Sequence, residues 1–381
     1  MRENKDIAGG ITGKKRIKII VSGGGTGGHI FPAISIADEL KREINAEILF
    51  VGAEGRMEMT RVPEAGFKII GLPVVGFDRK KPWRNINVIF KLFKSISLSR
   101  KILREFKPEI VIGVGGYASG PMLKAAQKRN IPTLIQEQNS YAGVTNKLLA
   151  KKAEKICVAY DGMHRFFPAD RIIKTGNPIR SQILVTGKNR KEALESFGLI
   201  NDKKTQLVVG GSLGALTINE SLEKGLKKLV AGGIQVIWQT GKNFGNRGIE
   251  AAKGLKGVVV TPFISDMASA YKGADLIISR AGAASISEIQ ALGKAAILVP
   301  SPNVAEDHQT HNAMALVKKD AAIMIKDSEA REKLVDTALH LLSDSDKLME
   351  LGKNAAKDGI TDSAQRICHE VIEILSRQKN G

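Results

Sequence analysis

The sequence predicts an α/β protein made of two doubly wound parallel-sheet domains. The chain has 381 residues, which is more than one hydrophobic core usually supports, so two domains are the default expectation. Short apolar strand-like segments alternate with helical segments along almost the whole chain, and this alternation is typical of parallel α/β units. The alternation breaks near residue 178. It then restarts in the way that it began, with a strand followed by a glycine-rich turn and a helix.

Five strand-like segments occur in the first half of the chain. They cover residues 17–21, 46–51, 110–113, 132–136 and 155–158. A helix is expected over residues 33–43, after the first glycine-rich run. A Gly176-Asn177-Pro178 turn ends this series, and a polar, charged segment follows over residues 186–205.

Six strand-like segments occur in the second half. They cover residues 207–210, 235–239, 258–261, 276–279, 296–299 and 322–325. A last helix over residues 363–377 carries its apolar side chains on one face, namely Ile367, Val371, Ile374 and Leu375. We therefore expect an N-terminal domain of residues 1–177 and a C-terminal domain of residues 178–362, with the helix of about residues 363–381 packing back on the first domain.

The composition narrows the class of protein. Lys and Arg total 58 against 39 acidic residues, a net charge of +19, which suits an anionic partner such as nucleic acid, an acidic membrane surface or a phosphorylated substrate. Cys157 and Cys368 are the only cysteines, so no disulfide framework or CxxC metal site is expected, which is consistent with a reducing cytoplasm. Only His308 and His311 lie close in sequence, and we expect no metal or other cofactor. The first 15 residues lack the apolar region of a signal peptide, and no apolar run approaches the ~20 residues that span a bilayer.

A glycine-rich run, Ser22 to His29, follows the first strand. Its glycines let the backbone approach a ligand closely, and the helix behind it offers N–H groups and a positive dipole end to a phosphate. A structural turn between strand and helix is the alternative interpretation. His29 is unusual because a nucleotide-binding loop needs no imidazole. It is either a helix-start residue or a proton carrier beside a substrate hydroxyl.

Similar glycine-containing turns between a strand and a helix recur along the chain. Residues 113–121 and 210–215 form a second and a third glycine-rich turn, each after a strand. A fourth turn at residues 279–282 precedes a helix whose first turn is expected to contain Glu288. That carboxylate either complements the helix dipole or accepts the ribose hydroxyls of a nucleotide. A polar helix start at residues 303–313 follows the next strand.

The stretch from Arg79 to Lys107 contains ten basic residues and one acidic residue, Glu105. Positions 89, 92, 93, 96 and 103 form one helical face that we expect to be buried, whereas Trp83, Phe90 and Leu98 lie off that face. Basic charge beside exposed apolar side chains is typical of proteins that lie on an anionic bilayer. We favour this interpretation over a plain solvated helix. No nucleic-acid-binding motif accompanies the charge.

Six motifs occur in the order in which they occur in the MurG family of bacterial N-acetylglucosaminyltransferases, which the chain resembles over nearly its whole length. They are GGTGGHIFPA at residues 24–33, GGYASGP at 115–121, EQN at 137–139, GNPIR at 176–180, GGSLGA at 210–215 and DHQ at 307–309. The resemblance implies the GT-B fold, in which two Rossmann-like domains face a cleft. It also implies inverting transfer of GlcNAc from UDP-GlcNAc to the 4-hydroxyl of MurNAc in lipid I, giving lipid II, without an obligatory metal.

The resemblance also implies roles for individual residues. The N-terminal domain holds the lipid acceptor and the C-terminal domain holds UDP-GlcNAc. The donor contacts are Thr26, Gly27, Gly28, Asn139, Arg180, Ser212, Ile264, Ala283, Ala284, Ser285, Ile286, Ser287, Glu288 and Gln309. The acceptor diphosphate contacts are Gly24, Gly25, Gly115, Gly116, Tyr117 and Ser119. His29 is the first candidate for the general base and Glu137 the second, while Trp83, Phe90 and Phe93 dock on the membrane.

Other assignments remain open at the level of sequence. A related transferase that glycosylates diacylglycerol shares the donor chemistry and the membrane docking. A UDP-GlcNAc 2-epimerase shares the two-domain build, and a nucleotide-sugar-binding module without activity is a third possibility. The resemblance places the protein peripherally at the cytoplasmic face of the cell membrane, with the cell-wall and division machinery as candidate partners.

Overall fold

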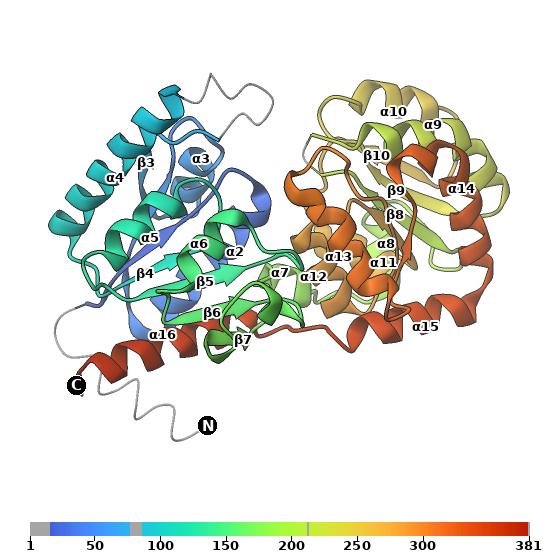
Figure 1. The fold of residues 1–381 in the computed structure, drawn as a ribbon. Helices are drawn as coiled ribbons and strands as arrows, with labels where there is room; N and C mark the ends of the chain where they lie inside the picture. Colours follow the sequence, from blue (N-terminus) through green and yellow to red (C-terminus); the bar gives the residue numbers. More distant parts are fainter. Residues whose placement is uncertain (1–15, 77–85, 212, 380–381) are drawn as a thin grey trace. The chain divides into compact units, whose positions relative to one another are not determined.

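The computed structural model describes residues 16–76, 86–211 and 213–379, and the chain in it divides into two compact units (Figure 1). Unit 1 consists of Met1–Ile179 with Asp362–Gly381, and unit 2 consists of Arg180–Thr361. Each unit contains one parallel sheet with helices packed on it. The predicted fold class, two parallel-sheet α/β domains, is confirmed.

The described strands of unit 1 form a seven-stranded parallel sheet in the order β3-β2-β1-β4-β5-β6-β7. They are β1 (Lys18–Ser22), β2 (Glu47–Ala53), β3 (Lys68–Leu72), β4 (Ile110–Gly113), β5 (Thr133–Glu137), β6 (Lys155–Val158) and β7 (Ile172–Lys174). The sequence did not predict β3 and β7. Both are edge strands whose residues are mostly half-buried, both contain a lysine, and β7 has only three residues.

Helices cover both faces of this sheet. They are α2 (Gly27–Ile44), α3 (Glu58–Glu64), α4 (Ile86–Phe106), α5 (Ser119–Gln127), α6 (Val144–Ala150) and α16 (Ser363–Lys379). One core contains buried side chains of α2, α3 and α16, and the other contains those of α4, α5 and α6. Side chains of the strands alternate between the two cores, so that Ile19 belongs to one core and Ile20 to the other.

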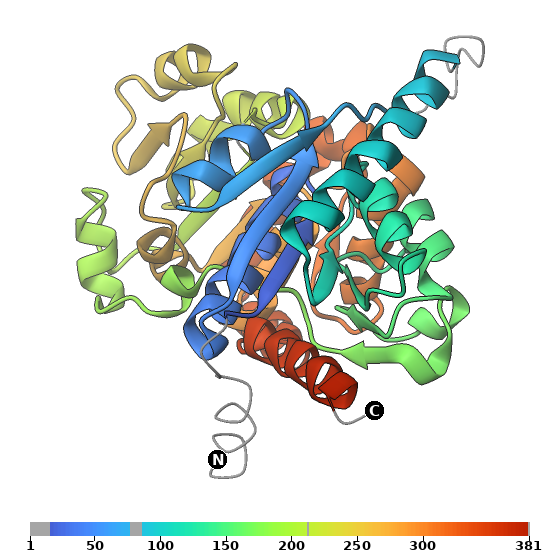
Figure 2. The same cartoon turned by 90° about the vertical axis from the view of Figure 1, so that its left-hand side faces the viewer.

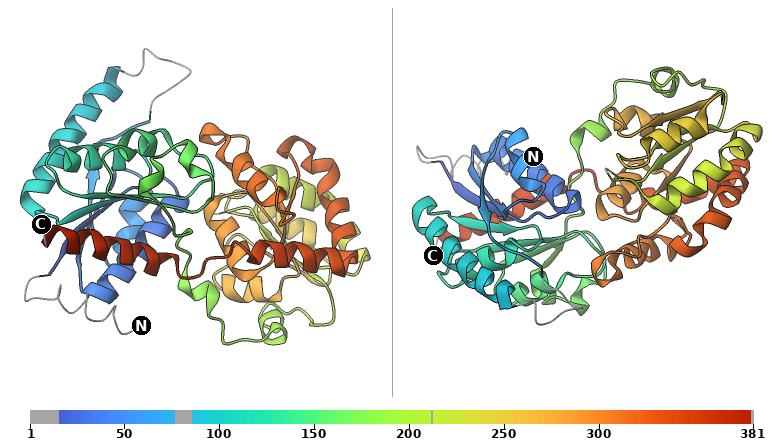
Figure 3. Two further views of the ribbon diagram at one scale, coloured as in Figure 1. Left: turned by 60° about the horizontal axis from the view of Figure 1, so that its bottom comes forward. Right: turned by 90° about the horizontal axis from the view of Figure 1, so that it is seen from above.

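Helix α16 packs against α2 in unit 1 (Figure 2). Its apolar side chains are all buried, namely Ile367, Val371, Ile374 and Leu375. The chain therefore leaves unit 1 after Ile179, builds unit 2 and returns from α15 (Ser345–Ala356) to α16 (Figure 3). An ion pair of 3.7 Å between Lys155 on β6 and Glu370 on α16 adds to this attachment.

The described strands of unit 2 form a six-stranded parallel sheet in the order β10-β9-β8-β11-β12-β13. They are β8 (Thr205–Val209), β9 (Gln235–Gln239), β10 (Val258–Thr261), β11 (Leu276–Ser279), β12 (Ala295–Leu298) and β13 (Ile323–Met324). The helices are α7 (Ser181–Leu184), α8 (Arg190–Glu195), α9 (Leu216–Ala231), α10 (Gly245–Ala252), α11 (Met267–Gly273), α12 (Ala283–Leu292), α13 (His308–Val317), α14 (Asp327–Ser343) and α15 (Ser345–Ala356). Helix α8 lies inside the segment that the sequence predicted only as polar. An Asn189–Glu192 capping box begins it.

Candidate functional site

The glycine-rich turns lie where the strand order of each sheet reverses. In unit 1, β1 has β2 on one side and β4 on the other, so the turns after β1 and β4 are neighbours. In unit 2, β8 is flanked in the same way by β9 and β11. Ligands of open α/β sheets bind at these switch points, outside the carboxyl ends of the strands. Each unit therefore has its own candidate site.

Helix α2 begins at Gly27, six residues before the predicted start at residue 33. Its N-cap is Thr26, whose backbone is extended with φ −144° and ψ 158°. Pro32 lies inside the helix and has no N–H group to donate to the carbonyl of Gly28. Gly27, Gly28 and His29 are thus the first helical residues, and the amide of His29 donates to the carbonyl of Thr26 at 3.1 Å.

The first glycine loop, Gly23 to Thr26, is held by internal hydrogen bonds. The amide of Gly24 donates to the carbonyl of Gly115 at 3.3 Å. The amide of Gly25 donates to the Glu58 carboxylate at 2.9 Å. The sequence assigned Gly24 and Gly25 to the acceptor diphosphate, but in this structure both amides have acceptors within the protein.

The second glycine loop lies against the first. A Cβ on Gly116 would be 2.3 Å from the carbonyl oxygen of Gly24, and both Gly115 and Gly116 have positive φ, so only glycine fits here. The hydroxyl of buried Ser119 donates to the Gly116 carbonyl at 3.1 Å, which closes the turn at the start of α5. The Tyr117 side chain is exposed.

The imidazole of His29 lies between the two loops. A Cβ on Gly115 would be 2.9 Å from its Nε2, so the ring rests on the backbone of the second loop. Its Nδ1 is 3.2 Å from the Thr26 hydroxyl, a hydrogen bond whose direction depends on the tautomer. The first helical turn and the second loop therefore fix both sides of the ring.

Glu137 ends β5 and is 2% exposed. One carboxylate oxygen accepts the backbone and side-chain N–H groups of Asn139 at 3.1 and 3.2 Å. The other accepts the amide of Gly143 at 3.0 Å and the side chain of Asn146 at 2.9 Å. These four donors hold the carboxylate to the loop that leads into α6, and they also orient Asn139.

A cavity of about 540 Å³ lies at the switch point of unit 2. It is lined by much of the third glycine loop, the start of α9, the start of α12 and the segment after β12. Its lining residues are Val209, Gly210, Gly211, Gly214, Ala215, Leu216, Thr217, Arg280, Gly282, Ser285, Ser301, Pro302, Asn303, Gln309 and Asp327. Ser285 and Gln309 are predicted donor contacts. The side-chain oxygen of Gln309 accepts the amide of Ser301 at 2.8 Å. Ser212, another predicted contact, lies outside the described residues.

Arg280 supplies a cation to this cavity that the sequence analysis did not identify. Its Nη1 donates to the carbonyls of Val299 and Pro300, both at 3.2 Å, and to the Asp327 carboxylate. Asp327 also accepts the Thr217 hydroxyl at 2.9 Å. No acceptor among residues 16–76, 86–211 and 213–379 is bonded to the other two guanidinium nitrogens. A sequence signal existed, since Arg280 directly follows β11 at a switch point.

Glu288 lies in the second turn of α12, not in the first turn as predicted, because the helix already begins at Ala283 after the extended Gly282. The side chain is 6% exposed. Its Oε1 accepts Arg180 Nε at 3.3 Å and Nη2 at 3.0 Å, and its Oε2 accepts the Tyr271 hydroxyl at 2.8 Å. Burial first, and then the charge of Glu288, hold the pKa of Tyr271 well above its usual value, so the phenol stays protonated and donates.

The other predicted donor contacts also fall on these elements. Ala283, Ala284, Ser285, Ile286 and Ser287 form the first turns of α12, and the Ser287 hydroxyl donates to the Ala283 carbonyl at 2.9 Å. Ile264 is buried in the loop between β10 and α11. Thr26, Gly27, Gly28 and Asn139 belong to unit 1, so the proposed donor set draws on both units.

Helix α4 exposes an apolar patch among basic residues. Phe90 is 70% exposed and Phe93 is 67% exposed, with Lys91 and Lys94 beside them, whereas Trp83 lies outside the described residues. The predicted buried face was wrong at positions 89, 92 and 93, which are exposed. The buried face contains Val88, Ser95, Ser99, Ile102 and Leu103 instead.

Two serine hydroxyls explain why polar residues can lie on the buried face of α4. Ser95 donates to the Lys91 carbonyl at 2.7 Å and Ser99 to the Ser95 carbonyl at 2.8 Å, so their polar groups are satisfied inside the helix. Small side chains with satisfied hydroxyls allow α4 to pack on α5, and the larger apolar side chains turn outward.

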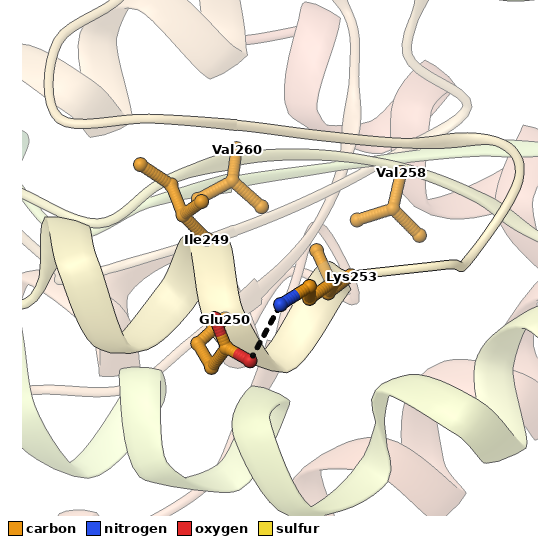
Figure 4. A pocket seen from close by; sticks show the side chains of 6 residues that line it. Ile249, Glu250, Lys253, Val258 and Val260 are labelled. Carbon is orange, nitrogen blue, oxygen red and sulfur yellow. Dashed lines mark hydrogen bonds and ion pairs between the residues drawn. The ribbon is translucent and has the colours of Figure 1, made fainter.

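A second cavity of about 360 Å³ lies between α10 and β10 (Figure 4). Ile249, Val258 and Val260 line it, and Glu250 pairs with Lys253 at 3.5 Å. No predicted site residue lines it.

The described residues contain no group of three or more His, Cys, Asp or Glu side chains arranged to bind a metal ion. No helix in the described part of the chain is both long and apolar enough to cross a membrane.

Comparisons with known proteins agree over the whole chain. The family models for the glycosyltransferase family 28 N-terminal and C-terminal domains match residues 19–158 and 205–367. A Phocaeicola vulgatus protein is 59% identical over 374 residues, 97% of this chain and 100% of that protein. A Bacteroides fragilis protein is 58% identical over 366 residues, 95% of this chain and 96% of that protein.

Both of these relatives are named UDP-N-acetylglucosamine–N-acetylmuramyl-(pentapeptide) pyrophosphoryl-undecaprenol N-acetylglucosamine transferase. Among solved structures, the crystal structure of Acinetobacter baumannii MurG has a TM-score of 0.76 and 28% identity. That match covers 94% of this chain and 99% of the other.

Proposed function

The chain belongs to glycosyltransferase family 28, and on that premise we propose how its residues transfer N-acetylglucosamine. One observation carries the assignment of the reaction: a relative named for this transferase is 59% identical over 97% of the chain. The protein is an N-acetylglucosaminyltransferase that uses UDP-GlcNAc and lipid I to make lipid II. The enzyme class and the reaction predicted from the sequence are confirmed.

The reaction requires two kinds of help from the protein. The 4-hydroxyl oxygen of MurNAc bonds to the anomeric carbon of GlcNAc while the bond from that carbon to the diphosphate oxygen breaks. UDP leaves with the bonding electron pair, and the hydroxyl proton passes to a base. The protein must therefore stabilise charge on the departing diphosphate and hold a base at the attacking oxygen.

We assign the diphosphate to the cavity of unit 2. The third glycine loop and the N-terminus of α12 offer backbone N–H groups there. Arg280 adds a guanidinium whose orientation is fixed by Asp327. Arg180, which the resemblance places among the donor contacts, donates twice to Glu288, and we assign it to the orientation of that carboxylate towards the ribose.

We assign the base to His29 and an orienting role to Glu137. The His29 ring is fixed by Thr26 on one side and by the backbone of Gly115 on the other, which suits a base that must meet one substrate oxygen. The Glu137 carboxylate already accepts four hydrogen bonds and is buried, so taking a proton would break bonds that hold Asn139.

We assign the acceptor diphosphate to the amides of Gly27 and Gly28 at the start of α2 and to the second glycine loop. The amides of Gly24 and Gly25 already donate within the protein. These two glycines therefore shape the first loop and donate no hydrogen bond to the diphosphate. Helices α2 and α5 both begin at the switch point of the same sheet, so their N-terminal N–H groups lie at the same edge.

We propose that the apolar patch of α4, Phe90 and Phe93 with the adjoining lysines, docks on the anionic cytoplasmic face of the membrane. The exposed aromatic rings supply buried area in the interface, and the basic side chains supply attraction to acidic lipids. An association with the cell-wall and division machinery remains a prediction from the resemblance.

The test is an assay with UDP-GlcNAc and a water-soluble short-chain lipid I analogue. Wild type and the control His164→Ala, at an exposed histidine, should form the disaccharide and UDP. His29→Ala should lose about 10²–10⁴-fold in kcat, the usual contribution of a general base, while its affinity for UDP changes less than about twofold. Release of ManNAc and UDP by wild type would identify an epimerase. Unchanged turnover of His29→Ala would place the base elsewhere.

A further inference from the structure

Glu58, the first residue of α3, is a buried carboxylate beneath the first glycine loop. It is 1% exposed, and no described Lys, Arg or His forms an ion pair with it. One oxygen accepts the amide of Ala53 at the end of β2, and the other accepts the amide of Gly25, both at 2.9 Å. Burying a carboxyl group is costly unless its oxygens are hydrogen-bonded, and these two hydrogen bonds both offset that cost and hold the side chain in place.

Glycines on both sides make room for this carboxylate. A Cβ on Gly24 would lie 2.2 Å from Oε1 of Glu58, and the φ of Gly24, +145°, itself favours glycine. A Cβ on Gly52 of β2 would lie 2.6 Å from Cγ of Glu58. The strand and the loop are therefore both shaped around this one side chain.

The constraint continues from the loop to the imidazole. The amide of Gly24 donates to the carbonyl of Gly115, and the backbones of Gly24 and Gly116 are in direct contact. The ring of His29 in turn rests on Gly115. A displacement of the first loop would therefore move the second loop and the support of the imidazole with it.

We propose that Glu58 is a positioning residue of the acceptor site, which fixes both glycine loops and, through them, His29. The proposal rests on the proposed function of those loops. A carboxylate is required because both oxygens accept from backbone N–H groups. In Glu58→Gln one of those oxygens becomes an NH₂ group that faces an N–H donor, so one of the two anchors is lost.

The experiment measures steady-state kinetics of Glu58→Gln with UDP-GlcNAc and the short-chain lipid I analogue, together with UDP affinity by calorimetry. The matched control is Glu64→Gln, at an exposed residue of the same helix. We expect the KM for the acceptor to rise and kcat/KM to fall about 10–100-fold, the range for one charged hydrogen bond lost at a buried site. UDP affinity should stay within about twofold, since its cavity belongs to unit 2. A lower folded fraction alone would reduce kcat and leave KM unchanged, so KM is the decisive readout.

A second variant covers the case in which Glu58→Gln does not fold. Glu58→Asp keeps the charge but is one methylene shorter, so it reaches only one of the two amides. It should also raise KM for the acceptor, and hydrogen exchange should accelerate in residues 23–29 and 114–118. Wild-type KM in the folded variants, or an equal loss of UDP affinity, would overturn the proposal. Absence of disaccharide with wild-type enzyme would instead contradict the proposed function.

Discussion

Glu288→Gln tests the assignment of the ribose contact, and the structure sets the size of the effect. A carboxylate has about four lone-pair sites. Three are occupied, by Arg180 Nε and Nη2 on Oε1 and by the Tyr271 hydroxyl on Oε2. If these partners stay in place, one site remains, so we expect Glu288 to accept one ribose hydroxyl and not both.

A hydrogen bond to a charged group contributes about 1.5–3 kcal/mol, which corresponds to about a 10–150-fold weaker Kd when it is lost. The amide of Glu288→Gln keeps the shape of the side chain, and the Tyr271 hydroxyl can rotate to accept from it. We therefore expect UDP affinity to fall within that range without loss of the fold. The control is Glu250→Gln, at an exposed carboxylate of the same unit.

Calorimetry with UDP and with 2′,3′-dideoxy-UDP distinguishes the ribose contact from a general disturbance. Wild type should prefer UDP by the factor given above, and Glu288→Gln should bind the two ligands nearly equally. A variant that binds UDP within threefold of wild type, or that keeps the full preference for UDP, would refute this reasoning.

Three further predictions concern other parts of the chain. Asp327→Asn should weaken UDP binding about tenfold and leave uridine binding unchanged, because it releases the guanidinium of Arg280 from its anchor; calorimetry with both ligands checks this. Replacing Phe90 and Phe93 together by Ser should lower cosedimentation with anionic vesicles about 10–100-fold and spare turnover of a water-soluble acceptor, and unchanged sedimentation would contradict docking through α4. The hydrogen bonds from Ser269 lower the pKa of Asp266, the N-cap of α11, from 3.8 to about 2. Its contribution to stability should therefore be complete above pH 3.8 and fade towards about pH 2, so the difference in unfolding free energy between wild type and Asp266→Asn should shrink over that interval.

Much of the fold was predictable because its signals are local. Central strands such as residues 110–113 and 276–279 are short, mostly apolar runs, and their predicted bounds match β4 and β11. The apolar face of α16 was readable for the same reason, since side chains four residues apart share a helical face. Edge strands β3 and β7 were missed: β7 has only three residues, and a lysine stands at one end of each strand.

The faces and partners of individual side chains required the tertiary structure. Helix α4 has apolar residues around much of its circumference, so periodicity alone did not reveal that Ser95 and Ser99 face the core. Glu58 and Gly25 are 33 positions apart, and Arg180 and Glu288 are 108 positions apart. No local pattern links such pairs, because the folding of each unit brings them together.

The sequence by itself determined the two parallel-sheet units, the glycine turns at their switch points and the reaction class, since each depends on short motifs and their order. The tertiary structure decided which groups in those turns remain available to a ligand. It assigned the amides of Gly24 and Gly25 to internal acceptors, placed Arg280 at the cavity of unit 2 and buried Glu58 beneath the first loop. The physical reason is that a hydrogen bond made within the protein removes that donor from binding, and only the packed structure shows which bonds are made.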